Sequence, residues 1–253
     1  MEMRGSNGMW GLGKTFRFPY LIIGETASLR SHGSSSVPKG RHQQANAHTL
    51  IIACGALVRE IQAVLVANHM HGFDIRAVPA TYHNRPEKIA GGVKRLLDRA
   101  EGRFSQVFVA YADCGTGGAL DQLLDARGVV RLPGAHCYAF YSGVEAFTAR
   151  GDADMRAFFL TDFLARHFEA LVIRGLGLDR HPELRDAYFG NYERVVYLSQ
   201  APDADLLARA EAAAERLGLA FEHRPVGYGD LATGIAGLDR KGATGTSVTG
   251  SKS

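Results

Sequence analysis

The chain has 253 residues, of which 46% are hydrophobic and 22% charged, and these values suit a globular protein with one domain or one domain plus an insertion. The net charge is only +3 and its excess lies in the first 46 residues, so it gives little support for a nucleic-acid partner. No apolar run reaches the roughly 18 residues of a membrane span, and the apolar segment at 18–23 is too short for a signal-peptide core. Three cysteines cannot form a disulfide scaffold, so we expect a cytoplasmic protein.

Both ends of the chain lack a sustained apolar period. Residues 1–46 include SHGSSSVPKGRHQQ, which predicts a flexible tail or a start codon assigned too early. Residues 239–253 predict a second tail. The folded part is therefore expected to be a single α/β domain over 47–238.

Between the tails, apolar strands alternate with amphipathic helices. The first strand is expected at 49–55, and the helix after it carries Val58, Ile61, Val64 and Leu65 on one face. The further expected strands are at 73–80, 105–113, 129–140, 194–200 and 219–225. The further expected helices are at 89–100, 118–128, 154–174, 182–190 and 203–218.

This alternation is typical of a three-layer α/β fold with a mainly parallel sheet flanked by helices. The apolar segment 154–174 is read as a buried helix that opens a helical insertion at about 150–192. A pseudo-repeat is also expected, because a shift of 146 positions overlays residues 49–93 on 195–239 with strand on strand and helix on helix. In the second copy Gln200 replaces Cys54 and Gly229 replaces His83, which would leave the chemistry in the first copy.

The three cysteines each lie near the end of an expected strand. Cys54 ends LIIAC, Cys114 follows VFVAYAD and Cys137 lies in LPGAHCY. The carboxyl ends of parallel strands line the crevice where ligands bind, so the three thiols are predicted to converge on one metal. Three thiolates suit zinc or an iron–sulfur cluster with one open position.

Other interpretations of the cysteines remain open. Free cysteine often packs as a small buried hydrophobe, and the chain has no CxxC pair. A single reactive thiolate is a third reading, since Cys114 precedes a glycine loop and a helix start.

Polar residues near the same strand ends supply candidates for catalysis and binding. His83 and Asp113 are the candidate catalytic residues, for ligation or proton transfer. The candidate substrate-binding side chains are Asn84, Arg85, Thr116 and Tyr141. His136 would point to the opposite sheet face if its strand were regular. Asp162 and Arg166 are spaced for an ordinary helix ion pair.

The loop CGTGG follows a strand and precedes a helix, as phosphate-binding loops do, but it lacks GxGxxG spacing. No GxSxG, HExxH or GxxxxGK[ST] occurs, so the standard hydrolase, zincin and P-loop readings have no support.

Several segments in order carry a family likeness. ACGALVREI, YHNRPEKI, YADCGTGG, HCYAFYSG and FFLTDFLARHFE together resemble the uncharacterised bacterial and archaeal family called domain of unknown function 1638. The resemblance places the three cysteines, His83, Asn84 and Pro86 in family motifs over about residues 48–236. Members are often encoded near corrinoid-dependent methyltransferases for methylamines, which implies a setting in one-carbon metabolism.

The expected function is that of a metalloenzyme acting on a small molecule of one-carbon or sulfur metabolism, through lyase, desulfurase or group-transfer chemistry. A [4Fe–4S] cluster is placed slightly ahead of zinc, and the metal-free form is kept as an alternative. The rival functions are a non-enzymatic accessory of corrinoid methyltransferase components and a small-molecule-binding domain with buried cysteines. No nucleic-acid or membrane partner is expected.

Overall fold

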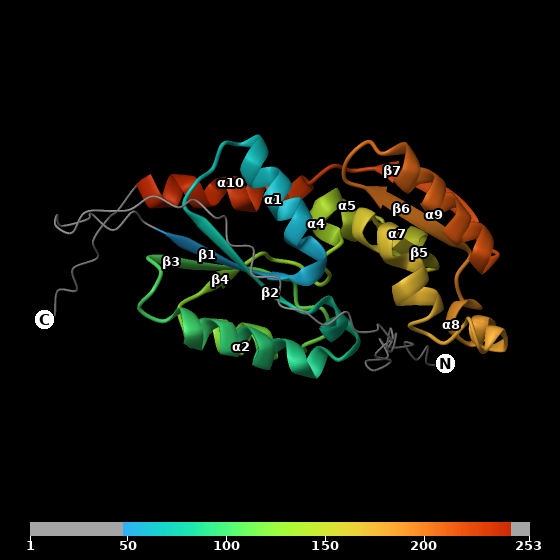
Figure 1. The fold of residues 1–253 in the computed structure, drawn as a ribbon, viewed down its shortest axis with the longest axis horizontal. Helices are drawn as coiled ribbons and strands as arrows, with labels where there is room; N and C mark the ends of the chain where they lie inside the picture. The colour runs from blue at the N-terminus through green and yellow to red at the C-terminus, as the bar shows by residue number, and fades with distance from the viewer. Residues whose placement is uncertain (1–47, 244–253) are drawn as a thin grey trace, which may run out of the picture.

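The computed structural model describes residues 48–243, and its strands form two separate parallel sheets (Figure 1). The first sheet has the order β2 (Phe73–Val78), β1 (Thr49–Cys54), β3 (Gln106–Ala110) and β4 (Val130–Arg131). The second has the order β5 (Ala157–Thr161), β6 (Arg194–Ser199) and β7 (Ala220–Pro225). Every strand pair is parallel, so the predicted α/β class with helix-flanked parallel strands is confirmed.

Helices cover both faces of the first sheet. Figure 1 shows α2 (Ile89–Ala100) below it, and α1 (Val58–Ala67) beside α10 (Gly229–Ala243) above it. The shorter helix α3 (Ala119–Asp125) packs against α2. The core is formed by side chains on the faces of the sheet and by the apolar sides of the helices that cover them. Ile51, Ile61 and Val109 are completely buried there.

The second sheet has its own core. Helix α7 (Asp162–Phe168) continues into a π-helical turn (Glu169–Ile173), and it packs on α9 (Ala204–Leu217). The side chains of Leu160, Val195 and Leu206 join these helices in a hydrophobic cluster separate from that of the first sheet. Asp203 caps the start of α9 by accepting a hydrogen bond from the Leu206 amide, and Gly218 ends it at φ +64°.

Short helices complete the described chain. Four of them are α-helical: α4 (Ala139–Ser142), α5 (Val144–Ala149), α6 (Gly151–Asp154) and α8 (Arg185–Phe189). Single 3-10 turns occupy Gly55–Leu57, Ala80–Asn84, Pro86–Lys88 and Pro182–Leu184. Within 48–243 no helix is both long and apolar enough to cross a membrane.

The predicted helix at 154–174 is wrong in its first third. Residues 157–161 form β5, the strand that begins the second sheet, and α7 starts only at Asp162. The sequence AFFLT contains two aromatic residues and a β-branched residue, which favour a strand, and the Thr161 hydroxyl caps α7 by accepting from the Leu164 amide. The supposed helical insertion at 150–192 is therefore part of a second strand-and-helix unit.

The predicted fourth strand is also much shorter than expected. The strand β4 contains only Val130 and Arg131, because Pro133 lacks an amide hydrogen and Gly134 adopts φ +145°. Cys137 consequently lies in a loop before α4, and the argument that placed His136 on the far sheet face does not apply.

The predicted repeat agrees with the element order. A shift of 146 positions carries β1, α1 and β2 onto β6, α9 and β7, and the two units belong to different sheets. The expected tail at 1–46 lies outside the described residues. At the other end α10 reaches Ala243, so helix continues past residue 238.

Candidate functional site

The fold brings the three cysteines together at the carboxyl edge of the first sheet. Cys54 is the last residue of β1, Cys114 lies in the turn after β3, and Cys137 lies in the loop after β4. The Sγ atoms of Cys114 and Cys137 are 3.3 Å apart, and the thiol of Cys54 contacts that of Cys137. All three are free and buried, with exposed fractions of 1%, 5% and 5%.

The turn that carries Cys114 is held by backbone bonds to the loop that carries Cys137. The amides of Asp113 and Cys114 donate to the carbonyls of Gly134 and Ala135, at 3.0 and 2.8 Å. Cys114 itself adopts φ +49°, a left-handed conformation that residues with a Cβ adopt rarely. The strained residue is thus one of the three thiols, and the two loops fix its position.

Asp113 organises this turn. Its carboxylate accepts hydrogen bonds from the amides of Gly115 and Gly118 and from the hydroxyl of Thr116. Burial alone would raise the pKa of Asp113, but these bonds outweigh burial and lower it. A carboxylate committed in this way supports the loop, and it is poorly placed to move protons.

His83 is the charged partner of the thiols. It comes from the 3-10 turn after β2, and its imidazole contacts both Cys54 and Cys114. Burial alone would lower the pKa of His83, but the contacts with Cys114 and Cys54 raise it to about 10.

The thiols themselves separate into two kinds. Hydrogen bonding to Cys137 and then to His83 lowers the pKa of Cys114 to about 6, against the opposing effect of burial, and the same partners lower the pKa of Cys54. Burial raises the pKa of Cys137, and the neighbouring Cys114 and Cys54 add to the rise. The Cys137 sulfur also accepts a bond from the Ala112 amide at 3.5 Å.

The thiol cluster opens onto a cleft of about 860 Å³ between the two sheets. His83, Cys114 and Thr116 line it from the first sheet, whereas Phe159, Thr161 and Phe163 line it from the second. This volume lies within the range of small-molecule sites.

A row of aromatic rings forms part of this cleft. Tyr138 stacks on His136 with ring centroids 5.1 Å apart, and on Phe159 at 5.2 Å. Phe147 meets Tyr138 and Phe159 at 5.5 and 5.3 Å. All four residues line the cleft, and Tyr138 directly follows Cys137. Burial lowers the pKa of His136, and the neighbouring His83 adds to this.

The candidate substrate-binding residues fall in different places. Tyr141 lines the cleft, is 98% buried, and has no hydrogen-bond partner for its hydroxyl among the described residues. Thr116 lines the cleft too, although its hydroxyl is committed to Asp113. Arg85 is exposed and does not line the cleft, and the side chain of Asn84 lies outside what the structure describes.

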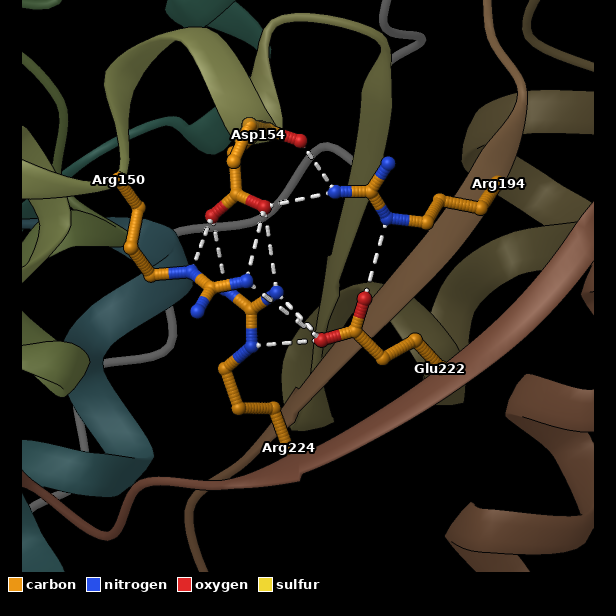
Figure 2. A network of polar contacts seen from close by, with 6 residues as sticks. Arg150, Asp154, Arg194, Glu222 and Arg224 are labelled. Carbon is orange, nitrogen blue, oxygen red and sulfur yellow. Dashed lines mark hydrogen bonds and ion pairs between the residues drawn. The ribbon is translucent and has the colours of Figure 1, made fainter.

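An ion network that the sequence did not predict borders the cleft. Figure 2 shows Asp154 between Arg150, Arg194 and Arg224, with Glu222 on the far side of the two arginines from β6 and β7. The Asp154 carboxylate is 5% exposed and accepts bonds of 2.9 Å from each of the three guanidinium groups. Arg150 and Asp154 have the i, i+4 spacing of a helix ion pair, but Arg194 and Arg224 are 40 and 70 residues from Asp154, so the sequence does not place them there.

Asp162 also differs from expectation. Its buried carboxylate accepts bonds from the Tyr197 hydroxyl at 2.7 Å and the Gln200 amide at 3.1 Å, and no ion pair joins it to Arg166. It links the start of α7 to β6 and the residue after it, so it supports the second sheet.

The cysteine and histidine side chains are of the kinds that bind zinc, but their distances in this structure do not match those of a metal site. In the part of the chain that the structure describes, no three His, Cys, Asp or Glu side chains are arranged to hold a metal ion. Two thiolates on one tetrahedral zinc lie about 3.8 Å apart, from a Zn–S distance of about 2.3 Å, so the 3.3 Å contact would have to open slightly.

Comparison with known proteins gives the family and nothing beyond it. No curated protein and no solved structure matches the chain. The family described as "Protein of unknown function (DUF1638)" matches residues 77–235, which include His83, Cys114 and Cys137 and leave out Cys54. This match covers more than half of the 253 residues, so the chain belongs to the DUF1638 family.

Proposed function

We propose that the protein is a metal-dependent enzyme that acts on a small molecule, with Cys54, Cys114 and Cys137 as ligands of one metal ion. The observation that carries the proposal is the contact of three thiols, distant in sequence, on the wall of one cleft. Thiolate is the form that binds metal, and the lowered pKa values of Cys54 and Cys114 favour that form.

The close packing of the sulfurs favours a single ion such as zinc over a [4Fe–4S] cluster, which the sequence placed slightly ahead. In a cluster each cysteine binds a different iron, so the sulfurs spread further apart than on one ion. Bound zinc would supply Lewis-acid activation of a substrate thiol, amine or oxygen.

The chain's own residues would divide the remaining work. His83 lines the cleft beside two of the thiols and would accept or donate the substrate's proton. The Ala112 amide would stabilise the Cys137 thiolate, as hydrogen bonds to metal-bound sulfur do. The apolar second-sheet wall would exclude water from the reacting groups. Group transfer to or from sulfur suits this arrangement.

A non-enzymatic accessory that hands metal to another protein is the second candidate. Metal transfer between proteins requires exposed thiols, and these three are at most 5% exposed. The burial of the thiols therefore favours a resident metal with a small-molecule substrate. Lyase activity, desulfurase activity and a link to corrinoid methyltransferase components are more specific hypotheses within this proposal.

Anaerobic purification under reductant followed by metal analysis tests the proposal. We expect one zinc per chain in the intact protein. Single substitutions Cys54→Ser, Cys114→Ser and Cys137→Ser should each abolish stoichiometric binding, because each removes one of three thiolates. Intense visible absorption would identify a cluster instead. Metal-free, stable protein would contradict the proposal, as would full zinc binding by any one of the three variants.

A further inference from the structure

The cleft combines aromatic rings with a buried polar group that has no hydrogen-bond partner among the residues that the structure describes. Tyr138, Phe147 and Phe159 are half-buried and line the cleft next to the thiol cluster. Their mutual centroid distances of 5.2–5.5 Å are typical of aromatic contacts. Tyr141 lines the same cleft, and its hydroxyl is buried without a hydrogen bond to any described residue.

An unsatisfied buried hydroxyl costs free energy unless water or a ligand supplies its partner. The backbone of Tyr141 is closely covered by α10, because a Cβ added at Gly229 would lie 2.3 Å from the Tyr141 carbonyl oxygen. Nothing that the chain provides among the described residues satisfies this hydroxyl. The hydroxyl has almost no exposed surface, so a polar group of a molecule in the cleft would satisfy it once the side chains that cover it shift.

We propose that the cleft binds a small aromatic molecule whose planar ring packs on the Tyr138, Phe147 and Phe159 side chains and whose hydroxyl or similar polar group hydrogen-bonds with Tyr141. The rings offer flat apolar surfaces with the preferred geometry for another ring, whereas a saturated ring of the same size is not flat. Asp154, which also lines the cleft, is already paired with three arginines, so its carboxylate is not available to select a cationic ligand.

This inference rests on the proposed function only in treating the cleft as the substrate site, and it can be tested without metal. The probes are phenol, cyclohexanol and benzene, titrated by calorimetry into the full chain with zinc and after removal of zinc by a chelator. Phenol should bind about 3–10-fold more tightly than cyclohexanol in both preparations. Loss of zinc binding with the phenol preference intact would overturn the proposed metal and leave this inference standing.

Variants separate the two contacts. Phe159→Leu should reduce the preference for phenol over cyclohexanol about threefold or more, and Phe147→Leu should act in the same direction. Tyr141→Phe should weaken phenol about 3–10-fold and leave benzene unchanged. Phe221→Leu is the matched control, because Phe221 is a half-buried phenylalanine of the second sheet that does not line the cleft, and it should leave all three affinities unchanged.

Circular dichroism will check that each variant is folded. If Phe159→Leu does not fold, the effect of Phe147→Leu on the preference for phenol tests the inference instead. Equal binding of phenol and cyclohexanol would overturn the inference. So would absence of phenol binding, or a Tyr141→Phe variant that weakens benzene as much as phenol.

Discussion

At the scale of single residues, His83 is the positively charged partner of two of the three thiols. Buried thiolates require a positive partner, because burial by itself favours the neutral thiol. His83 is in contact with both thiols whose pKa values are lowered, whereas burial and the two neighbouring thiols raise the pKa of Cys137. Hydrogen bonding to Cys137 and then to His83 therefore favours ionisation of Cys54 and Cys114 before that of Cys137.

The role of His83 can be tested against that of His136. Both line the cleft, but only His83 contacts the cysteines, so His136→Ala is the matched control. We expect His83→Ala to weaken zinc binding about 10–100-fold, as loss of a supporting group does, with His136→Ala unchanged. Competition with a coloured chelator measures both affinities.

Loss of stoichiometric zinc in His83→Ala, as expected for the cysteine variants, would make His83 a fourth ligand and leave no open position for substrate. An affinity equal to that of the unsubstituted protein would remove His83 from the site.

At the scale of elements, the success of the sequence-based interpretation depended on how local each signal was. The predicted strand ending at Cys54 and the helix face with Ile61 and Val64 were found, because period and strand composition act within a few residues. Residues 157–161 were predicted to be helical because their apolar run lies next to that of α7. In the structure they pair with β6, and this pairing makes them a strand. Such pairing is invisible in a single segment.

In the candidate site, too, some features could be predicted from the sequence and others could not. Parallel strands bring their carboxyl ends to one edge, so the three cysteines could be predicted to converge. The aromatic row could not be predicted, because its members come from different parts of the fold. Tyr138 lies in a loop, Phe147 in a short helix and Phe159 in a strand of the second sheet. Their meeting depends on how the two sheets are joined.

Two glycines of α10 test how closely that helix is packed on α4. A Cβ at Gly229 would lie 2.3 Å from the Tyr141 carbonyl oxygen and 2.4 Å from that of Phe140, and its φ is +40°. Gly229→Ala should therefore lower the free energy of unfolding by at least about 2 kcal/mol. Gly237→Ala is the matched control in the same helix, where an added Cβ meets nothing within 4 Å.

Gly237→Ala should raise stability by about 0.5–1 kcal/mol, because alanine favours the helix. Urea unfolding at pH 7 measures both changes. Similar values for the two variants would show that α10 is not seated on α4 as described.

At the scale of the whole molecule, the cleft depends on the segment that connects the two sheets. This segment carries α5 and α6, and with them Phe147 and Asp154. Arg194 of β6 and Arg224 of β7 bind Asp154, so the ion network fastens the connection to the second sheet (Figure 2). The position of Phe147 in the cleft, and thus the shape of the ligand site, should depend on that attachment.

The network makes a signed prediction for the dependence of stability on pH. Burial opposes ionisation of Asp154, but hydrogen bonds from Arg224 and Arg150 outweigh it and hold its pKa well below the usual range. Glu222, which shares Arg194 and Arg224, also has a lowered pKa despite burial. A carboxyl group whose pKa is lower in the folded state stabilises the fold above its ordinary pKa of about 4, and this contribution is lost as the pH falls further.

Asp154→Asn should therefore lower the free energy of unfolding by about 2–3 kcal/mol at pH 7, somewhat less than the roughly 3–5 kcal/mol of a fully buried pair, because Arg150 is half exposed. The difference from the unsubstituted protein should shrink as the pH is lowered from 5 to 3. Glu193→Gln, which removes an exposed pair with Arg156, is the control and should change stability by less than about 0.5 kcal/mol. Urea unfolding across this pH range measures both, and a difference for Asp154→Asn that stays constant would show that the ionised carboxylate does not stabilise this connection.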